Sequence, residues 1–332
     1  MRRANVIVWG NGSTLINSKG TYINERTSNL LSDISSENLK VFWCEGLIKD
    51  PTRVGLKNSS VPNNVQVIRK NIFSLFLGTR SHNLLFLPSK SNLIIGLFYA
   101  YILGKRCDIY LRGEIRSLGL LYRSLFKSKK LRIFLVSDLL VDNINVRAEI
   151  VKVKPLIHPI YLEETTSSRN MKNVLFVGRL ESEKGIIELC KASQISDDLV
   201  SLTVVGDGPL LDGLRAEYPN VKFLGLVSDH VILNELYHKS GLVILPSYHE
   251  GFPRVLVEGA LCGCCIMSTN VGGVSEVFEG EGFYHINIKD YLSINNQLYQ
   301  YVMDVEKGLI NRQRENVISR LFEGRKELHE IY

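Results

Sequence analysis

Two glutamates stand in the densest group of residues that could carry chemistry in this sequence. Glu250 and Glu258 are separated by seven residues, and an apolar run, Leu242–Leu245, comes shortly before them. Ligands of open α/β sheets bind at the carboxyl ends of such strands, so we expect Glu250 in a loop there and Glu258 on the following helix. Alone, this spacing is also typical of charge on a helix surface. The preceding strand and the Gly-Phe-Pro sequence at 251–253 favour a binding site instead.

The residues between the two glutamates fit a phosphate-binding turn. Gly251 lets the backbone approach a ligand closely, and Pro253 suits a first helical turn, where its missing N–H is not needed. The N–H groups around Arg254–Leu256 and the positive end of the helix can then hold a diphosphate. We therefore expect one extended ligand, with a sugar gripped by Glu250 and a ribose by Glu258.

A second group of charged residues follows another apolar run. The expected strand Asn173–Val177 leads into Gly178, and Arg179 and Lys184 lie in the loop beyond it. We expect both cations to reach the same crevice as Glu250, where they would neutralise phosphate charge and stabilise a leaving diphosphate. The open alternative is a helix-capping loop whose charges are solvated.

Two further junctions combine apolar runs with glycines. Gly206 and Gly208 follow the run Leu202–Val205, and we expect them to form the floor of a nucleotide pocket. The segment Ser268–Glu276 contains another glycine pair. It either borders the sugar or phosphates or is a plain tight turn, and the sequence leaves both interpretations open.

Parallel sheets are needed to position these junctions, and the alternation of apolar runs with helical stretches indicates an α/β protein. In the first half we expect strands at Asn5–Trp9, Lys40–Trp43, Val65–Ile68, Asn83–Leu87, Cys107–Leu111 and Arg132–Val136. In the second half we expect strands at Asn173–Val177, Leu202–Val205, Val221–Leu224, Leu242–Leu245 and Cys264–Ser268, with helices from about Gly185, from about Pro209 and over 254–262. The pattern lapses at Pro155–Ser168, which we expect to be a linker between two domains.

Charge is distributed unevenly along the chain. Residues 1–160 carry 24 Lys and Arg against 10 Asp and Glu, a balance of +14, whereas 161–332 carry 16 against 24, a balance of −8. This asymmetry indicates that one face meets something anionic, such as a membrane or a lipid-linked acceptor, and a solvated basic surface is the alternative. Leu118–Lys130 is expected to be a helix with a basic face, and with Arg116 and Arg132 it resembles an interfacial amphipathic segment. Its apolar side could equally pack on the sheet.

Metal sites and membrane spans are not expected. The six cysteines lack paired metal-ligand spacing, and Cys262–Cys265 is their only cluster, so we expect small buried thiols. No Asp-x-Asp triplet follows a suitable strand. The longest apolar stretch, Leu93–Leu103, is well short of the ~20 residues of a membrane span and is expected to be a core helix. Met1–Arg3 lead directly into the first strand, so no signal peptide is expected.

Together these residues resemble family 4 of the retaining glycosyltransferases (glycosyl transferases group 1), which has the GT-B fold. The resemblance covers about residues 171–285 and rests on Gly-Arg-Leu-x-x-x-Lys-Gly, Val-Gly-Asp-Gly-Pro, Phe-Leu-Gly at 223–225 and the Glu-x7-Glu helix. It implies two doubly wound Rossmann-like domains that face each other across a cleft. The acceptor would lie on the first, 1–160, and the nucleotide sugar on the second, 161–315. Residues 316–332 resemble the family's last helix, which crosses back to the N-terminal domain.

The resemblance also implies roles for single residues. Arg179 and Lys184 would bind the donor diphosphate and, with Glu250, act in catalysis. Glu258 would bind the ribose, and the backbone at Leu224–Gly225 would face the base. The remaining donor-binding positions are Gly10, Gly12, Gly178, Gly206, Gly251, Phe252, Pro253, Val255 and Leu256.

The N-terminal half departs from the family at one position. Many members have a histidine after the strand that corresponds to Asp108–Leu111, and it usually touches the donor sugar. This sequence has Arg112-Gly113-Glu114 instead. Arg112 or Glu114 would contact the acceptor or the sugar in its place, or the two would form a structural pair.

We therefore expect a retaining, metal-independent glycosyltransferase of the hexosyltransferase type, with no cofactor and no nucleic-acid partner. It would move a sugar from a nucleotide-diphosphate sugar to a hydroxyl of a glycan or lipid-linked acceptor, in bacterial surface polysaccharide or glycolipid assembly. We expect a cytoplasmic protein, with peripheral attachment to the anionic inner face of the cytoplasmic membrane left open. Two other functions also stay open: a non-catalytic donor-binding partner subunit and a sugar-nucleotide epimerase of the same fold.

Overall fold

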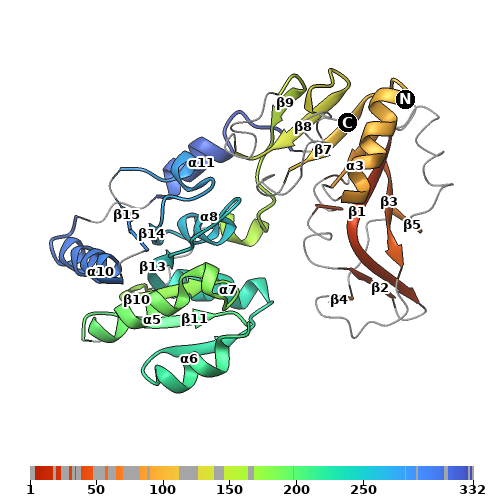
Figure 1. Cartoon of the computed structure of the whole chain (residues 1–332). Helices are drawn as coiled ribbons and strands as arrows, with labels where there is room; N and C mark the ends of the chain where they lie inside the picture. Colours follow the sequence, from red (N-terminus) through yellow and green to blue (C-terminus); the bar gives the residue numbers. More distant parts are fainter. Residues whose placement is uncertain are drawn as a thin grey trace. The chain divides into compact units, whose positions relative to one another are not determined.

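The computed structural model describes residues 4–17, 20–23, 30–31, 34, 39–47, 57–58, 65–69, 83–87, 90–111, 126–137, 146–163, 168–196, 198–280, 282–288, 291–309, 313–327 and 330. The chain divides into two compact units (Figure 1). Unit 1 comprises Met1–Leu156 with Gly324–Tyr332, and unit 2 comprises Ile157–Glu323. Each unit has its own sheet.

Unit 1 is built on a mainly parallel sheet. Its parallel strands follow the order β5-β3-β1-β6-β7-β8-β9. They are β1 (Ala4–Asn17), β3 (Leu39–Leu47), β5 (Val65–Arg69), β6 (Asn83–Phe86), β7 (Cys107–Tyr110), β8 (Leu131–Leu135) and β9 (Glu149–Lys152). The chain thus builds outward from β1 in one direction and then, from β6, in the other, which is the doubly wound Rossmann arrangement.

The first strand is longer than predicted. The sequence predicts a glycine turn after Trp9, but β1 continues to Asn17 with a register shift against β3 between Trp9 and Ser13. Gly10 and Gly12 lie within this shift. Beyond it, β1 pairs antiparallel with β2 (Gly20–Ile23), and β2 pairs with β4 (Lys57–Asn58). The glycine segment therefore redirects the strand instead of ending it, as bulges do.

A buried ion pair joins β7 to β8. Asp108 is 2% exposed and accepts hydrogen bonds from the Nε and Nη2 atoms of Arg132 at 2.8 and 2.7 Å. Arg132, which the sequence groups with a basic interfacial segment, is therefore engaged within the sheet. Residues 118–125 of the helix predicted over Leu118–Lys130 lie outside the described residues. Its last part, Lys127–Lys130, forms a turn before β8 and is not helical.

The longest apolar stretch forms α3 (Lys90–Leu97) and a π-helical turn, η1 (Phe98–Ile102). Tyr99 and Ala100 are buried and pack in the core of unit 1. The predicted core helix is confirmed for this face only, because Ile94 and Ile102 on the other side are 64% and 72% exposed. Within the described ranges, no helix has the length and apolarity to cross a membrane.

Unit 2 contains a parallel sheet in the order β12-β11-β10-β13-β14-β15. Its strands are β10 (Asn170–Val177), β11 (Ser201–Val205), β12 (Lys222–Gly225), β13 (Ser240–Leu245), β14 (Cys265–Ser268) and β15 (Phe283–His285). Counted along the chain from β10, this is the Rossmann order, with its reversal between β10 and β13. The five strands predicted in this half are confirmed, with ends displaced by up to three residues.

Helices pack in two groups around this sheet (Figure 1). One group pairs α5 (Ile186–Ile195) with α10 (Tyr291–Glu306). The other brings α7 (His230–Lys239) against α8 (Arg254–Leu261), and α8 also contacts α11 (Arg314–Leu321). Two shorter helices, α6 (Leu211–Glu217) and α9 (Val274–Val277), complete the described set.

The predicted linker contains ordered structure. Pro159–Leu162 forms a 3-10 turn, η3, that packs against α7 and α8. Tyr161 is 1% exposed, and its hydroxyl lies 2.8 Å from Nδ1 of His230 in α7. Tyr161 therefore anchors the segment from residue 157 to residue 163 to unit 2.

The helix predicted over 316–332 is wrong in extent. α11 ends at Leu321, and Lys326 forms a parallel bridge with Val153, next to which Lys154 pairs with Glu327 at 3.2 Å. Bridge pairing requires extended backbone, so a helix cannot continue through these residues. Residues 324–332 group with unit 1.

Candidate functional site

The reversal of strand order in unit 2 selects one place on the sheet. The crossovers that leave β10 and β13 run in opposite directions, and open α/β sheets bind ligands at the carboxyl ends of two such strands. The loop after β10 spans 178–185, and the loop after β13 spans 246–253. These loops contain Arg179, Lys184 and Glu250.

Lys184 and Glu250 meet across the two loops. Lys184 Nζ lies 2.5 Å from Glu250 Oε1, and Ser247 Oγ donates to the same oxygen at 2.7 Å. The Lys184 and Glu250 side chains are 21% and 11% exposed, so water screens the pair only in part. Charge-assisted bonds are stronger in such surroundings than on an open surface. The contact therefore fixes the orientation of the Glu250 carboxylate.

Further contacts hold the two loops together. Tyr248 N donates to the carbonyl of Glu183 at 2.9 Å, and the Tyr248 hydroxyl donates to Glu188 at 2.9 Å, a bond that raises the pKa of Tyr248. Gly185 has φ 65°, and a Cβ there would lie 1.9 Å from the carbonyl oxygen of Pro246. Glycine is therefore required for this approach.

The turn after β14 packs against the loop that carries Glu250. Gly272 has φ 56°, and a Cβ there would lie 2.1 Å from the carbonyl oxygen of Glu250. Gly273 N donates to the carbonyl of Gly251 at 3.0 Å. This geometry gives the segment 268–276 a supporting role, because it positions the backbone on which the carboxylate stands.

Arg179 lies apart from this pair. Its Nη2 is 2.9 Å from Glu181 Oε2, and its side chain is 70% exposed. An exposed ion pair of this kind contributes little to stability. The guanidinium is therefore free to exchange Glu181 for a stronger anion at the same loop.

Glycines let the neighbouring loops approach one another at this edge. Gly178 N donates to Val205 O at 3.0 Å, and Gly206 N donates to Gly225 O at 2.8 Å. Gly206 has φ 145°, and a Cβ there would lie 1.7 Å from the carbonyl oxygen of Gly178. Leu224, beside Gly225, is 37% exposed. The structure thus brings Gly206, predicted to form the floor of the pocket, next to Gly178 and to Gly225, whose backbone is predicted to face a base. Gly208 approaches Leu180, because a Cβ there would lie 2.6 Å from the Leu180 carbonyl oxygen.

The predicted helix start is close to the observed one. α8 begins at Arg254, directly after Pro253, and Phe252 and Val255 are half-buried while Leu256 is buried. No side chain caps the helix. Arg254 N and Leu256 N donate to the carbonyls of Phe252 and Pro253 at 3.0 and 3.1 Å. The positive partial charge at the start of a helix still suits an anion at this end of α8.

Glu258 is more buried than its predicted role of binding the ribose suggests. It is 9% exposed, and its Oε2 accepts a 3.0 Å hydrogen bond from the hydroxyl of Tyr237 in α7. Burial and the nearby Glu258 raise the pKa of Tyr237 well above its usual value, so Tyr237 remains a donor. Tyr237 in turn packs edge-to-face on Tyr161.

Sequence reasoning missed three residues of this site. Ser247 bonds to Glu250, Thr269 Oγ1 donates to the carbonyl of Ser247 at 2.6 Å, and Tyr237 bonds to Glu258. The position of Ser247, two residues after the end of a strand, was a signal for the first. Nothing local marks Tyr237, which lies 21 positions from its partner.

The other predicted residues are not in unit 2. Gly10 and Gly12 are in unit 1, at the reversal of its own strand order between β1 and β6. Arg112 and Glu114 lie outside the described residues.

In the part of the chain that the structure covers, no group of three or more His, Cys, Asp or Glu is arranged to hold a metal ion. The five cysteines whose side chains are described are buried thiols, as predicted, and burial raises the pKa of Cys107 and Cys190 to about 12.

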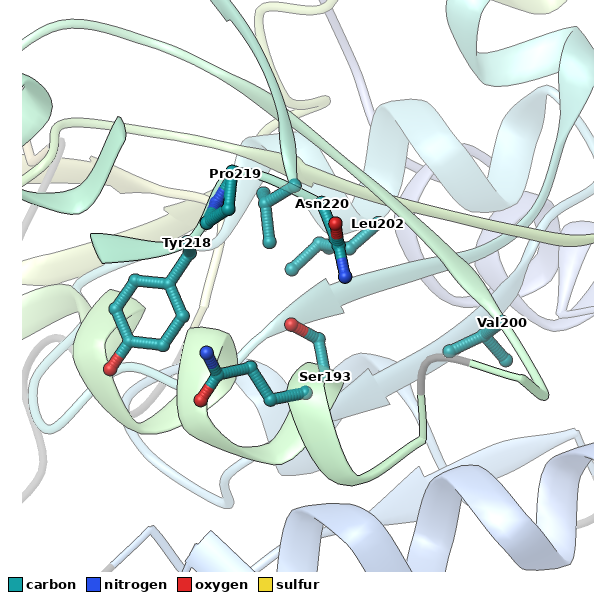
Figure 2. A pocket seen from close by; sticks show the side chains of 8 residues that line it. Ser193, Val200, Leu202, Tyr218, Pro219 and Asn220 are labelled. Atoms are coloured by element: carbon teal, nitrogen blue, oxygen red, sulfur yellow. The ribbon is translucent and has the colours of Figure 1, made fainter. Parts of the chain in front are cut away.

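A small pocket lies at the opposite edge of the same sheet (Figure 2). Ser193 from the end of α5, Leu202 from the start of β11 and Tyr218 after α6 line it. The pocket lies at the amino ends of the strands, away from Lys184 and Glu250. It is therefore separate from the candidate site.

Comparison with known proteins supports the resemblance seen in the sequence. Residues 171–304 match the family model described as Glycosyl transferases group 1. The 2-deoxystreptamine N-acetyl-D-glucosaminyltransferase of Niallia circulans is 30% identical over 161 residues, which are 45% of this chain and 41% of that protein. The N,N'-diacetylbacillosaminyl-diphospho-undecaprenol alpha-1,3-N-acetylgalactosaminyltransferase of Campylobacter jejuni is 30% identical over 150 residues, 40% of this chain and 39% of that protein. The matches thus span less than half of these two relatives.

Solved structures extend the likeness to both units. HepE from Anabaena, solved in complex with UDP, has a TM-score of 0.70 and 16% identity over 96% of this chain and 95% of that one. The predicted GT-B fold, with two Rossmann-like domains, is confirmed.

Replacing Gly185 with alanine should destabilise the protein more than the same change at Gly308. Both glycines have positive φ, 65° and 69°, so both variants incur the ~1 to 2 kcal/mol cost of a left-handed residue. Only Gly185 lacks room for a Cβ, which should add about 1 to 3 kcal/mol. Urea unfolding of Gly185→Ala and Gly308→Ala measures the difference, and equal stabilities would contradict the close approach to Pro246.

Removing the hydroxyl of Tyr237 should also destabilise the protein. Tyr237→Phe leaves the buried Glu258 carboxylate without this donor, so we expect the free energy of unfolding to fall by about 1 to 3 kcal/mol. Tyr299→Phe is the matched control, since Tyr299 is 55% exposed. If the two variants unfold at the same denaturant concentration, the bond to Glu258 does not support the fold.

Proposed function

We propose, on the premise that residues 171–304 belong to the group 1 glycosyl transferases, that this protein is a retaining glycosyltransferase. It transfers a sugar from a nucleotide-diphosphate sugar to an acceptor hydroxyl, in the assembly of bacterial surface polysaccharide or glycolipid. The Lys184–Glu250 pair at the strand-order reversal of unit 2 is the observation that carries this proposal. The pair sets a cation beside a carboxylate that can accept a hydrogen bond from a sugar hydroxyl. Both lie next to the start of α8, which suits phosphate.

The donor fits the site in an extended form. We assign its diphosphate to Lys184, Arg179 and the positive end of α8 at its start. Both bonds that Glu250 accepts use Oε1, so we assign Oε2 to a hydroxyl of the donor sugar. The ribose is assigned to Glu258 and the base to the backbone at Leu224–Gly225.

Catalysis depends on stabilising the negative charge that develops on the leaving diphosphate. The bond between the anomeric carbon and the diphosphate breaks, and negative charge builds on the leaving phosphate, where Lys184 and Arg179 stabilise it. The acceptor oxygen bonds to the anomeric carbon from the face that the diphosphate leaves, and a β-phosphate oxygen takes its proton. The sugar therefore keeps its anomeric configuration.

The acceptor is assigned to the N-terminal unit, which lies outside the residues that the family model matches. We propose a glycan or lipid-linked acceptor, bound by the N-terminal unit. The relative from Campylobacter jejuni is named for transfer to a diphospho-undecaprenol sugar, which supports an acceptor of this kind.

Loss of either cation should abolish most activity. We expect Arg179→Ala and Lys184→Ala each to slow sugar transfer by ~10²-fold or more, since each removes a charge that stabilises the leaving diphosphate. Hydrolysis of labelled sugar nucleotides, in a panel that includes UDP-sugars, measures this without knowledge of the acceptor. Arg215→Ala and Lys191→Ala, at exposed positions of the same unit, are the controls. Near-wild-type turnover in both site variants would show that the diphosphate binds elsewhere.

Chelation should leave the activity unchanged. Lys184 and Arg179 supply the positive charge that a magnesium ion brings to other phosphate-transfer sites. We therefore expect the same hydrolysis rate with and without EDTA. Complete loss with EDTA, restored by magnesium or manganese, would contradict the roles assigned to the two cations.

A further inference from the structure

An apolar stripe is exposed on the outer side of α3 and η1 in unit 1. Ile94, Phe98, Tyr101 and Ile102 are 64%, 42%, 53% and 72% exposed. They recur at helical spacing, so they lie along one side of the continuous α3–η1 helix. We call these four residues the apolar stripe.

The opposite side of the same helix is apolar too. Tyr99 and Ala100 are buried in the unit-1 core, and Ile95, Leu97 and Leu103 pack against it. A surface helix ordinarily presents polar residues outward, and one that is apolar all round is covered on both sides. A contiguous exposed apolar patch on a soluble protein usually marks an interaction site.

Basic residues border the stripe at its C-terminal end. Lys105 and Arg106 follow η1 directly, and Lys105 N donates to the Tyr99 carbonyl at 2.9 Å. The turn before β8 lies alongside, because Cys107 N donates to the Lys130 carbonyl at 3.0 Å and Cys107 pairs with Leu131. Four side chains of this group are exposed: Arg106, Lys127, Lys129 and Lys130. Together with Lys105 they form what we call the basic rim.

We infer that the apolar stripe and the basic rim form a docking surface for an anionic lipid bilayer. Apolar side chains beside lysines and arginines are the composition of segments that lie in a membrane interface, where the apolar groups enter the acyl boundary and the cations meet lipid phosphates. The surface differs from the one the sequence suggests, since Arg132 is engaged by Asp108. A second copy of the chain is a poorer occupant, because pairing the same patch would set two basic rims against each other.

This inference goes beyond the proposed function, since binding requires neither donor nor acceptor. The full chain is mixed with vesicles of phosphatidylcholine alone, or of phosphatidylcholine and phosphatidylglycerol in equal parts, and sedimented at low and high salt. We expect recovery with the anionic vesicles only, and weaker recovery at high salt, where the rim charges are screened.

Two variants test the two parts of the surface. Replacing Lys127, Lys129 and Lys130 with glutamate should lower the partition coefficient by about a hundredfold, since each basic residue near an anionic surface contributes roughly a fivefold preference. Phe98→Asn with Ile102→Asn should lower it by about tenfold or more through lost apolar burial. The matched controls are Lys172, Lys191 and Lys222 to glutamate, and Ile195→Asn with Tyr299→Asn, all exposed positions of unit 2.

Several outcomes would overturn the inference. Recovery in the supernatant under all conditions, or equal binding to neutral and anionic vesicles, excludes an anionic bilayer as the occupant. Undiminished binding by both patch variants places the contact on another surface. A dimer in analytical ultracentrifugation that Phe98→Asn with Ile102→Asn dissolves would assign the stripe to a second copy. Donor hydrolysis by the same variants, measured without vesicles, shows separately whether the proposed enzyme activity is intact.

Discussion

The ion pair between Lys184 and Glu250 depends on a constraint of parallel sheets, and the rest of the site depends on that pair. Crossovers in one direction from β10 and in the other from β13 leave two loops side by side at the carboxyl edge. The sequence places Lys184 in one loop and Glu250 in the other, and Lys184 Nζ lies 2.5 Å from Glu250 Oε1. Without the reversal of strand order, residues 66 positions apart would have no reason to be neighbours.

Close backbone packing converts this pair into a rigid site. Gly185 touches Pro246, Gly206 touches Gly178 and Gly272 touches the backbone of Glu250, each with no room for a Cβ. Carboxylates positioned in this way need little reordering when a ligand arrives, which lowers the entropy cost of binding. Arg179 is the exception, since its side chain is 70% exposed and its ion pair among the described residues is with Glu181. The site therefore combines a carboxylate held in one orientation with an exposed cation.

The sequence predicted what is encoded locally. Buried parallel strands are continuous apolar runs, so β10 to β14 could be placed to within three residues, and the glycines at their ends marked the site. The short strands β2, β4 and β9 lack such runs. The bond from Tyr237 to Glu258 depends on how α7 packs against α8, which no local pattern encodes. The prediction of a helix over 316–332 is wrong in extent because Lys326 pairs with Val153, which is far away in the sequence.

Net charge and site charge are separate properties in this protein. The C-terminal half carries a balance of −8, yet it holds the site assigned to an anionic donor. Two cations and a helix start suffice there because they act over short distances in a partly desolvated loop, where the bulk charge is screened. The excess of +14 in the N-terminal half is not needed for such a site. Charge spread over a surface suits an extended partner such as an anionic bilayer. The apolar stripe beside it adds hydrophobic attraction, which charge alone cannot give. On these two proposals, the C-terminal half binds its ligand through a few placed charges, and the N-terminal half binds a surface through spread charge and apolar area.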